Sequence, residues 1–364
     1  MRTVRMKLNS WTEWGELKEV VVGHCSMLDV ININHSFRFF FETNVSNDFL
    51  ERSVTLKKRF SEQRQEDLDQ IAQTLERLGI KTLRPLRPEV GARFRTPVFE
   101  EELIGAENIR DQSLIFGDEI IETSPLWDRR YFENELLKEI FNDYFEKGAR
   151  WTCSPKSRMR ESDYDRKFIS GFSPDEIERK YSEPSAYEIM FDGAQCLRFG
   201  RDIVMNVSTA NHWKGLQWLR RHLGDRARIH PVNLTDHHID GMFMPLREGL
   251  LLINCVGMQE KVQLLPDWLK KWKIIRVPEP LGSEESILKM ASANINVNVL
   301  PLSPKKTLVF EENEGDSRQT VDLLVQNGLE PIVVRLRHSR IFAGGLHCVT
   351  LDTVREDGPV WFSK

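Results

Sequence analysis

The sequence has few of the features that mark membrane, secreted or metal-binding proteins. None of its apolar runs reaches the roughly 18 residues that a transmembrane helix needs, and residues 1–10 contain no apolar core of signal-peptide length. The five cysteines are scattered and form no C-x-x-C pair, which argues against a zinc site and a redox dithiol. We therefore expect a cytoplasmic protein, in which a single cysteine in a distinctive setting is a candidate nucleophile.

The charge balance argues against two further classes of partner. The 51 lysines and arginines nearly match the 55 aspartates and glutamates, and the net charge of −4 is well mixed along the chain. Nothing in this balance indicates a nucleic-acid or membrane partner. The length of 364 residues permits one large domain or two ordinary ones, so the number of domains must be judged from the pattern along the chain.

Short β-type runs recur along the chain, often in pairs joined by a tight turn. They occupy residues 17–23, 113–121, 202–207, 241–254, 298–311 and 345–351. Helical periodicity lies between them, at residues 63–78, 211–223 and 318–326. The order of hairpin, helix and strand returns about five times, which indicates a cyclic or solenoid array of α/β units without excluding two unrelated domains. Residues 153–184 are highly charged and poor in apolar side chains, so we expect a long surface loop or insertion there, with a lid as one interpretation.

One cysteine has a distinctive setting. Cys348 follows the run Gly344-Gly345-Leu346-His347 and precedes a β-type run. Paired glycines let a backbone approach a ligand closely or adopt a positive φ. This pattern would place the thiol at the start of a strand, on the edge of a cleft. The alternative interpretation is a buried strand cysteine beside a Gly-Gly turn.

A histidine pair is the second candidate for chemistry. His238 and Asp240 form a His-x-Asp pair, and on a strand both side chains would face the same side. A histidine beside a carboxylate suits general acid–base chemistry, although an isolated match of this kind is more often a pair on a surface loop. Adjacent histidines on a strand face opposite ways, so a metal site at His237 and His238 is a weak interpretation.

Three acids lie at equivalent places in three of the repeat units: Asp111, Asp192 and Asp240. Taken alone, each is more often structural, for example as the cap of a turn. A radial array of the units would aim all three at a common axis. Such a cage suits one planar cation, because a guanidinium offers five donors in a fixed fork that carboxylates accept in pairs.

The order of these residues resembles the L-arginine amidinotransferases, a family that includes glycine amidinotransferase, inosamine-phosphate amidinotransferase and enzymes of cyanobacterial toxin pathways. The resemblance extends over nearly the whole chain. It rests on the segments SWTEWGELKEVVVG (10–23), RTPVFE (95–100), RDQSLIFGDEIIE (110–122), RRYFE (129–133), FGRDI (199–203), WLRRHLG (218–224), HID (238–240), NVL (298–300) and GGLHC (344–348). The runs CLRFGRD (196–202) and SPKK (303–306) look most similar to the toxin-pathway branch of the saxitoxin and cylindrospermopsin enzymes.

The resemblance implies a fold and an assembly. It implies a single α/β domain over residues 1–364, built as a five-bladed α/β propeller of ββαβ units with pseudo-fivefold symmetry. The active site would lie at the base of the central channel. The resemblance also implies a homodimer, small-molecule substrates, and no metal, nucleotide or organic cofactor.

The resemblance also implies roles for five residues. Cys348 would be the nucleophile, and His238 the general acid and base. Asp192 would orient that histidine and raise its basicity, while Asp111 and Asp240 would bind the guanidinium. We therefore predict an amidinotransferase of natural-product or toxin biosynthesis, which moves the amidino group of L-arginine to an amine through an S-amidino-cysteine.

The chain departs from the family pattern at three places. After the 241–254 hairpin, family members that use arginine carry an arginine that binds the substrate carboxylate, whereas this chain has Gly257. A Ser-Ser pair of the family is Ala291-Ser292 here, which leaves Ser292 as a substrate contact. His237 fills a position that varies with the acceptor, and it indicates an acceptor other than glycine. Two alternative functions stay open: a guanidine hydrolase of the same superfamily, in which water replaces the amine, and a non-catalytic guanidine-binding protein.

Overall fold

The computed structural model describes residues 6–26, 30–31, 33–41, 54–55, 57–89, 91–278 and 295–363. Five three-stranded sheets contain most of the strands in these ranges, and all five repeat one arrangement. Two strands pair in antiparallel fashion, a helix follows, and the third strand pairs in parallel with the second. The ββαβ unit that the sequence indicated is therefore present five times in the described part of the chain.

The five units use consecutive stretches of the chain, apart from the first, which takes its outer strand from the C-terminus. The first unit contains β19 (Thr350–Glu356), β1 (Glu16–Val22), α2 (Lys58–Arg77) and β4 (Lys81–Leu83). The second contains β7 (Ser113–Phe116), β8 (Glu119–Glu122), α3 (Lys138–Phe145) and β9 (Arg150–Cys153). The third contains β10 (Cys196–Phe199), β11 (Asp202–Asn206), α5 (Ala210–Leu223) and β12 (Arg228–Val232). The fourth contains β13 (Phe243–Arg247), β14 (Leu250–Asn254), α6 (Asp267–Lys270) and β15 (Lys273–Val277). The fifth contains β16 (Leu300–Ser303), β17 (Lys306–Glu311), α7 (Arg318–Gln326) and β18 (Glu330–Arg335). Within the described ranges, two short antiparallel strand pairs and two α-helices lie outside the units: β2 (Val30–Ile31) with β3 (Val54–Thr55), β5 (Arg93–Arg95) with β6 (Glu100–Glu102), α1 (His35–Phe41) and α4 (Pro174–Lys180).

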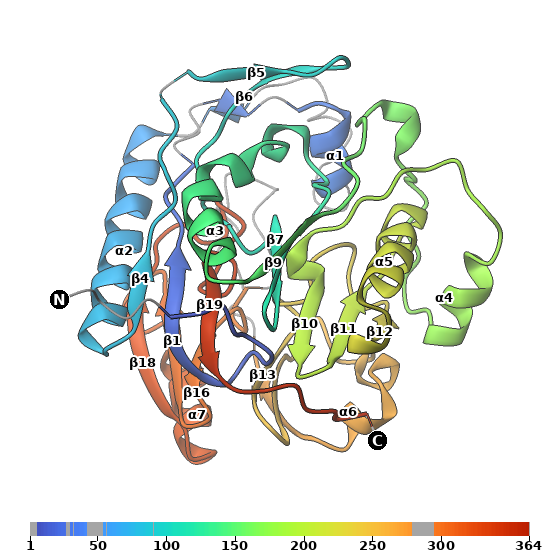
Figure 1. Ribbon diagram of the computed structural model, residues 1–364. Helices are drawn as coiled ribbons and strands as arrows, with labels where there is room; N and C mark the ends of the chain where they lie inside the picture. The colour runs from blue at the N-terminus through green and yellow to red at the C-terminus, as the bar shows by residue number, and fades with distance from the viewer. Residues whose placement is uncertain are drawn as a thin grey trace.

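The two ends of the chain share one sheet. Strand β19 pairs antiparallel with β1, from Glu16 opposite Glu356 to Val22 opposite Thr350. Figure 1 shows these two strands side by side, β1 in blue and β19 in red. The last β-type run of the sequence therefore pairs with the N-terminal strand β1. Its strand, β19, begins a few residues later than predicted.

The helices cover the sheets with one apolar face. In α2, the longest of them, the buried residues Leu68, Ile71 and Leu75 recur at helical spacing and belong to the same core cluster as Val20 and Val22 of β1. Full burial of one such leucine or isoleucine contributes about 1.5–3 kcal/mol. Within the ranges that the structure describes, no helix combines the length and the apolar character that crossing a membrane requires.

The structure corrects the prediction that His238 and Asp240 lie on a strand. Both lie in the turn between β12 and β13. The backbone N–H groups of Met242 and Phe243 close this turn by donating to the carbonyl oxygen of Ile239, over 2.8 and 3.1 Å. The His-x-Asp spacing does not by itself distinguish a strand from a turn over so few residues.

Residues 153–184 form a long connection between β9 and β10 that contains helix α4, and many of their side chains are exposed. The connection is also packed in part, because Met159 and Tyr164 are buried in the core. Their acids serve the backbone: Asp165 Oδ2 accepts a hydrogen bond from the N–H of Ala210, over 2.8 Å, at the start of α5. A few apolar side chains and internal hydrogen bonds are enough to pack this segment, and composition does not reveal them.

A network of buried charges connects three of the sheets. Arg198 of β10 donates to Glu13 over 2.9 and 2.7 Å and to Asp352 of β19 over 2.7 Å. Arg110, just before β7, donates to the same Asp352 over 2.5 Å. All four side chains are buried. Because charges out of water are stable only when paired, this network makes each member depend on the others.

We expect Arg198→Met to lower the free energy of unfolding by about 3–5 kcal/mol, because it would leave Glu13 and Asp352 buried without their shared partner. Urea unfolding followed by tryptophan fluorescence measures the change. Arg93→Met is the matched control: its pair with Glu100 is exposed on both sides, so we expect a loss below about 1 kcal/mol. Equal losses in the two variants would contradict the importance of the buried network.

Candidate active site

Each of the five sheets has a buried acid, amide or thiol side chain two to four residues before its first strand. These side chains are Asp111 before β7, Asp192 before β10, Asp240 before β13, Asn298 before β16 and Cys348 before β19. The equivalence that the sequence indicated for the three acids is present in the structure. Asn298 and Cys348 complete the set, so every unit contributes one group.

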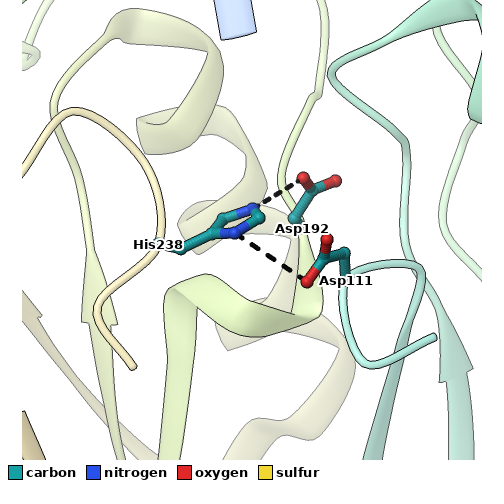
Figure 2. Close-up of side chains that lie close together, drawn as sticks. All are labelled: Asp111, Asp192 and His238. Carbon is teal, nitrogen blue, oxygen red and sulfur yellow. Dashed lines mark hydrogen bonds and ion pairs between the residues drawn. The ribbon is translucent and has the colours of Figure 1, made fainter. Parts of the chain in front are cut away.

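His238 lies between two of these acids (Figure 2). Its Nε2 atom is 2.9 Å from Asp192 Oδ2, and its Nδ1 atom is 3.8 Å from Asp111 Oδ1. Burial disfavours the charged imidazole, but the charge of Asp111 and the hydrogen bond with Asp192 outweigh it and raise the pKa of His238 to about 9. His238 therefore carries a proton at neutral pH that it can deliver to a departing amine.

Asp111 has one oxygen that accepts a hydrogen bond and one that faces His238 without a hydrogen bond. Oδ2 accepts a hydrogen bond from Arg130 Nη1 over 2.5 Å, and Glu133 anchors Arg130 in turn, at 2.6 Å from its Nε atom. The other oxygen, Oδ1, is buried and accepts no hydrogen bond from the described residues. Burial raises the pKa of Asp111 in spite of the nearby cations His238 and Arg130. A buried carboxylate oxygen without a hydrogen bond suits an N–H donor of a cationic ligand.

Among the described residues, Asp111, Asp192 and His238 form the one group whose ligand atoms lie close enough together to hold a metal ion. Ligand atoms of Asp111, Asp192 and His238 all lie within 4.8 Å of one another. A metal would need the lone pair of an imidazole nitrogen, and the raised pKa of His238 keeps that nitrogen protonated at neutral pH. The group therefore suits proton transfer better than metal binding, and a cofactor-free site stays our prediction.

The Cys348 thiol lies between a hydrogen-bond acceptor and a hydrogen-bond donor. Sγ donates to Asp240 Oδ2 over 3.3 Å and accepts from Asn298 Nδ2 over 3.1 Å. Burial, together with the negative charges of Asp240 and Asp111, raises the pKa of the Cys348 thiol well above its ordinary value. The sulfur is therefore protonated when no ligand is bound. A cation held among the acids would offset their charges and favour the thiolate.

His347 links the site to the buried charge network. Its Nδ1 atom is 2.8 Å from Asp240 Oδ2, and its Nε2 atom is 3.2 Å from Glu13 Oε2. Burial opposes the charge on Asp240, but His347 outweighs it and lowers the pKa of that carboxyl. Sequence reasoning gave His347 no role, because Glu13 lies more than 300 residues away along the chain.

The glycine pair lets the loop before Cys348 pass close to two asparagines. A Cβ atom on Gly344 would lie 2.0 Å from Asn108 Oδ1, and one on Gly345 would lie 2.7 Å from the Cβ of Asn298. Both contacts are closer than real Cβ atoms allow. The predicted need for a close approach is present, but the neighbours are protein side chains. Cys348 lies in this loop, so the prediction that it begins a strand was wrong by two residues.

His237 packs into an aromatic cluster beside the site. Its Nε2 atom is 2.8 Å from the carbonyl oxygen of Phe39, and its ring stacks on Phe40 with centroids 5.5 Å apart. Phe40 in turn contacts His238 edge-on, over 5.3 Å. Burial and the charge of His238 lower the pKa of His237 to about 4, so this side chain is neutral. It borders the acid–base group through Phe40.

Two other predicted positions have a different outcome. Ser292 lies outside the described residues. Gly257 lies in the turn after β14, where its N–H donates to Asn254 Oδ1 over 2.7 Å. Four residues further on, Lys261 donates through Nζ to the carbonyl oxygen of Leu234 over 2.6 Å. This stretch of chain therefore carries a positive charge at Lys261 and none at Gly257.

Comparison with known proteins covers nearly the whole chain. An L-arginine:L-lysine amidinotransferase of Pseudomonas savastanoi pv. phaseolicola is 31% identical over 360 residues, which cover 95% of this chain and 94% of the relative. Among solved structures, inosamine-phosphate amidinotransferase of Streptomyces griseus has a TM-score of 0.85 at 27% identity and covers 99% of this chain and 100% of its own. An amidinotransferase of the saxitoxin biosynthetic pathway of Microseira wollei has a TM-score of 0.79 at 28% identity, with 98% and 99% covered.

No family model matches the chain. The relatives nonetheless agree with the site, because all three are amidinotransferases and each is matched over almost its full length. The resemblance stated from the sequence segments is confirmed. The chain belongs to the amidinotransferases, the enzymes that transfer amidino groups.

Proposed function

We propose that the protein transfers the amidino group of L-arginine to an amine by way of an S-amidino intermediate on Cys348. The observation that carries the proposal is that a buried carboxylate lies beside each reacting group: Asp240 Oδ2 is 3.3 Å from Cys348 Sγ, and Asp111 Oδ1 is 3.8 Å from His238 Nδ1. Paired carboxylates beside a thiol and a proton donor suit a guanidinium, whose donors form a fixed fork. The name of the Pseudomonas relative includes the same donor, L-arginine.

In the first half-reaction, the guanidinium binds between Asp111 and Asp240 and offsets the charges that keep Cys348 protonated. The thiol proton is then released to solvent, and the sulfur becomes the strong nucleophile that a resonance-stabilised guanidinium requires. The thiolate attacks the central carbon and forms a C–S bond. The C–N bond to the departing amine breaks as His238 donates its proton to that nitrogen. Ornithine leaves, and an S-amidino-cysteine remains.

In the second half-reaction, the acceptor amine attacks the amidino carbon and gives one proton to His238. The C–S bond breaks, and its electron pair returns to Sγ of Cys348. The histidine that acted as an acid now acts as a base, while Asp192 holds its Nε2 atom in both steps. One site used twice in succession gives ping-pong kinetics.

We infer further that residues 1–364 form a single domain, in which the five units close into a five-bladed propeller with pseudo-fivefold symmetry. The buried apolar clusters support a ring. One cluster joins the first unit to the second, another joins the second to the third, and a third one runs through the third, fourth and fifth units. The remaining large cluster joins the fifth unit to the first. Closure of this kind would bring the five positions before the first strands to one axis.

We also propose that the acceptor is an amine other than glycine and that the reaction belongs to natural-product or toxin biosynthesis. Glycine carries only a carboxylate next to its amine. The neutral His237 and the ring of Phe40, which lies beside His238, support an acceptor that carries further groups there. The saxitoxin pathway of the Microseira structure supports the setting, as does the inosamine phosphate in the name of the Streptomyces structure.

The test is incubation with L-arginine alone, followed by intact mass measurement and peptide mapping. We expect a mass gain of one amidino group on the peptide that carries Cys348, and one equivalent of ornithine per active site. Amines can then be screened for the one that removes the added mass. Without an acceptor the reaction should stop after this single turnover.

Two outcomes would contradict the proposal. Continuous formation of urea and ornithine without an amine would show that water discharges the S-amidino intermediate. Continuous formation of citrulline and ammonia would show that ammonia leaves in place of ornithine. Either result would identify a hydrolase. If L-arginine protected Cys348 from iodoacetamide but formed neither an adduct nor ornithine, the protein would be a guanidine-binding protein without turnover.

A further inference from the structure

The side chain of Asn298 contacts the sulfur and the backbone of Cys348 at once. Its Oδ1 atom accepts hydrogen bonds from the backbone N–H groups of His347, over 2.9 Å, and of Cys348, over 3.1 Å. Its Nδ2 atom is 3.1 Å from Cys348 Sγ. The side chain is buried, so solvent does not compete for these contacts.

These contacts fix which end of the amide faces the sulfur. The two backbone groups are donors, so the amide oxygen must face them. The opposite orientation would place the amide N–H groups against two backbone N–H groups and leave the N–H of Cys348 without an acceptor. The amide NH₂ group therefore points at Sγ as a hydrogen-bond donor.

We propose that Asn298 is a further catalytic residue, whose amide N–H stabilises the negative charge on Cys348 Sγ. The inference rests on the proposed function of Cys348 as the nucleophile. The other polar group at the sulfur is the Asp240 carboxylate, which accepts the S–H and disfavours the anion. Among the described contacts of Sγ, the one from Asn298 favours the anion, because an N–H donates best to a charged acceptor.

The sulfur carries a negative charge at two points of the reaction. It does so before it forms the C–S bond with the guanidine carbon, and again when that bond breaks and the electron pair returns to sulfur. Asn298 donates to sulfur at both points and exchanges no proton. Losing this donor raises the thiol pKa and therefore lowers the thiolate fraction. The nucleophilicity of the remaining thiolate rises with that pKa, with a Brønsted coefficient of about 0.4–0.5. A tenfold smaller thiolate fraction should therefore slow attack by roughly threefold.

Two substitutions separate the donor from the structural half of the side chain. Asn298→Asp keeps an oxygen for both backbone N–H groups and replaces the donor by a second oxygen. Asn298→Ala removes both halves. Asn108→Ala is the matched control, because the Asn108 amide holds the same loop at the carbonyl oxygen of Phe342, over 3.0 Å, without a hydrogen bond to the sulfur.

The measurement is the rate of iodoacetamide alkylation at Cys348 as a function of pH, read on its peptide by mass spectrometry. Below the midpoint the rate rises about tenfold per pH unit. We expect Asn298→Asp and Asn298→Ala to lower it by about threefold or more at each pH, and Asn108→Ala to leave the curve in place. Thermal unfolding shows whether each variant folds. If Asn298→Ala does not fold, the alkylation rate of Asn298→Asp tests the proposal.

Unchanged alkylation in the folded Asn298→Asp variant would overturn the inference, and so would an equal loss in Asn108→Ala. The assay needs no amidino transfer, so it is independent of the proposed function. If the wild-type protein formed no adduct with L-arginine while the curves still separated, the proposed function would fail and the donation to sulfur would stand. If the wild-type protein formed the adduct with L-arginine while the alkylation curves of the variants coincided with its own, the proposed function would stand and the donation to sulfur would fail.

Discussion

Replacement of Cys348 with serine is expected to lower amidino transfer by about 10⁴-fold or more, because a hydroxyl cannot supply the nucleophile in this site. The features that raise the pKa of the thiol are burial and the charges of Asp240 and Asp111, and all of them remain in the variant. A hydroxyl starts from a much higher pKa, so it stays protonated even beside a bound guanidinium. Ornithine release in the presence of L-arginine and an amine measures the loss.

Binding should survive this substitution, because the carboxylates that hold the cation are untouched. We expect Cys348→Ser to bind L-arginine in calorimetric titration without forming a covalent adduct. Cys153→Ser is the control: Cys153 is exposed at the end of β9, and its replacement should leave turnover unchanged. Wild-type turnover in Cys348→Ser would show that another group attacks the guanidine.

Much of the architecture follows from patterns that a single sequence carries. The hairpin at 113–121 was predicted from two β-type runs joined by a tight Gly-Asp turn, and strands β7 and β8 occupy it. Helix α7 has the bounds that its periodicity indicated. Such elements are local, since a turn and one buried face determine them. The His238–Asp240 turn was misread because a short turn and a short strand can bury the same apolar residues.

The acids of the site were found from their recurrence at one place in the repeat, just before a first strand. The same rule, carried to the remaining sheets, would have pointed to Asn298, which precedes β16 as Cys348 precedes β19. Asn298 was passed over because asparagine beside a strand is ordinary turn chemistry. Its meaning depends on the two backbone N–H groups that orient its amide, and a sequence does not contain that geometry.

Glu13 and Arg130 illustrate a second limit. Each is buried and bonded to a residue of the site, Glu13 to His347 and Arg130 to Asp111. In the sequence both look like members of mixed, solvated charge runs, because most charged residues are exposed. Only the packing of separate units reveals that these two are paired inside the molecule.

His238→Gln is expected to lower the rate of ornithine release by about 10²- to 10⁴-fold, the usual contribution of a positioned general acid. Glutamine can still hydrogen-bond to Asp192, but it has no proton to give. His230→Gln is a close control, since His230 pairs with Asp202 over 2.8 Å at similar exposure, in a sheet edge away from Cys348. A comparable loss in His230→Gln would attribute the effect to folding.

The pH dependence identifies the proton that His238 donates. The reactive form has a proton on His238 and none on Cys348, so it holds one proton fewer than the resting form. Below the His238 pKa of about 9, raising the pH by one unit should increase kcat/KM for L-arginine about tenfold. Above it, His238 loses its proton and cancels the gain, so the curve should level off until the thiol titrates.

Asp192→Asn removes a hydrogen bond and a charge that raise the pKa of His238. The pKa should therefore fall, and the curve should level off at a lower pH and a lower maximum than in the wild-type protein. Asp202→Asn breaks the comparable pair with His230 and should leave the break in place. If the break did not move in Asp192→Asn, the group that titrates near pH 9 would not be His238, and the proton for the departing amine would have to come from elsewhere in the site.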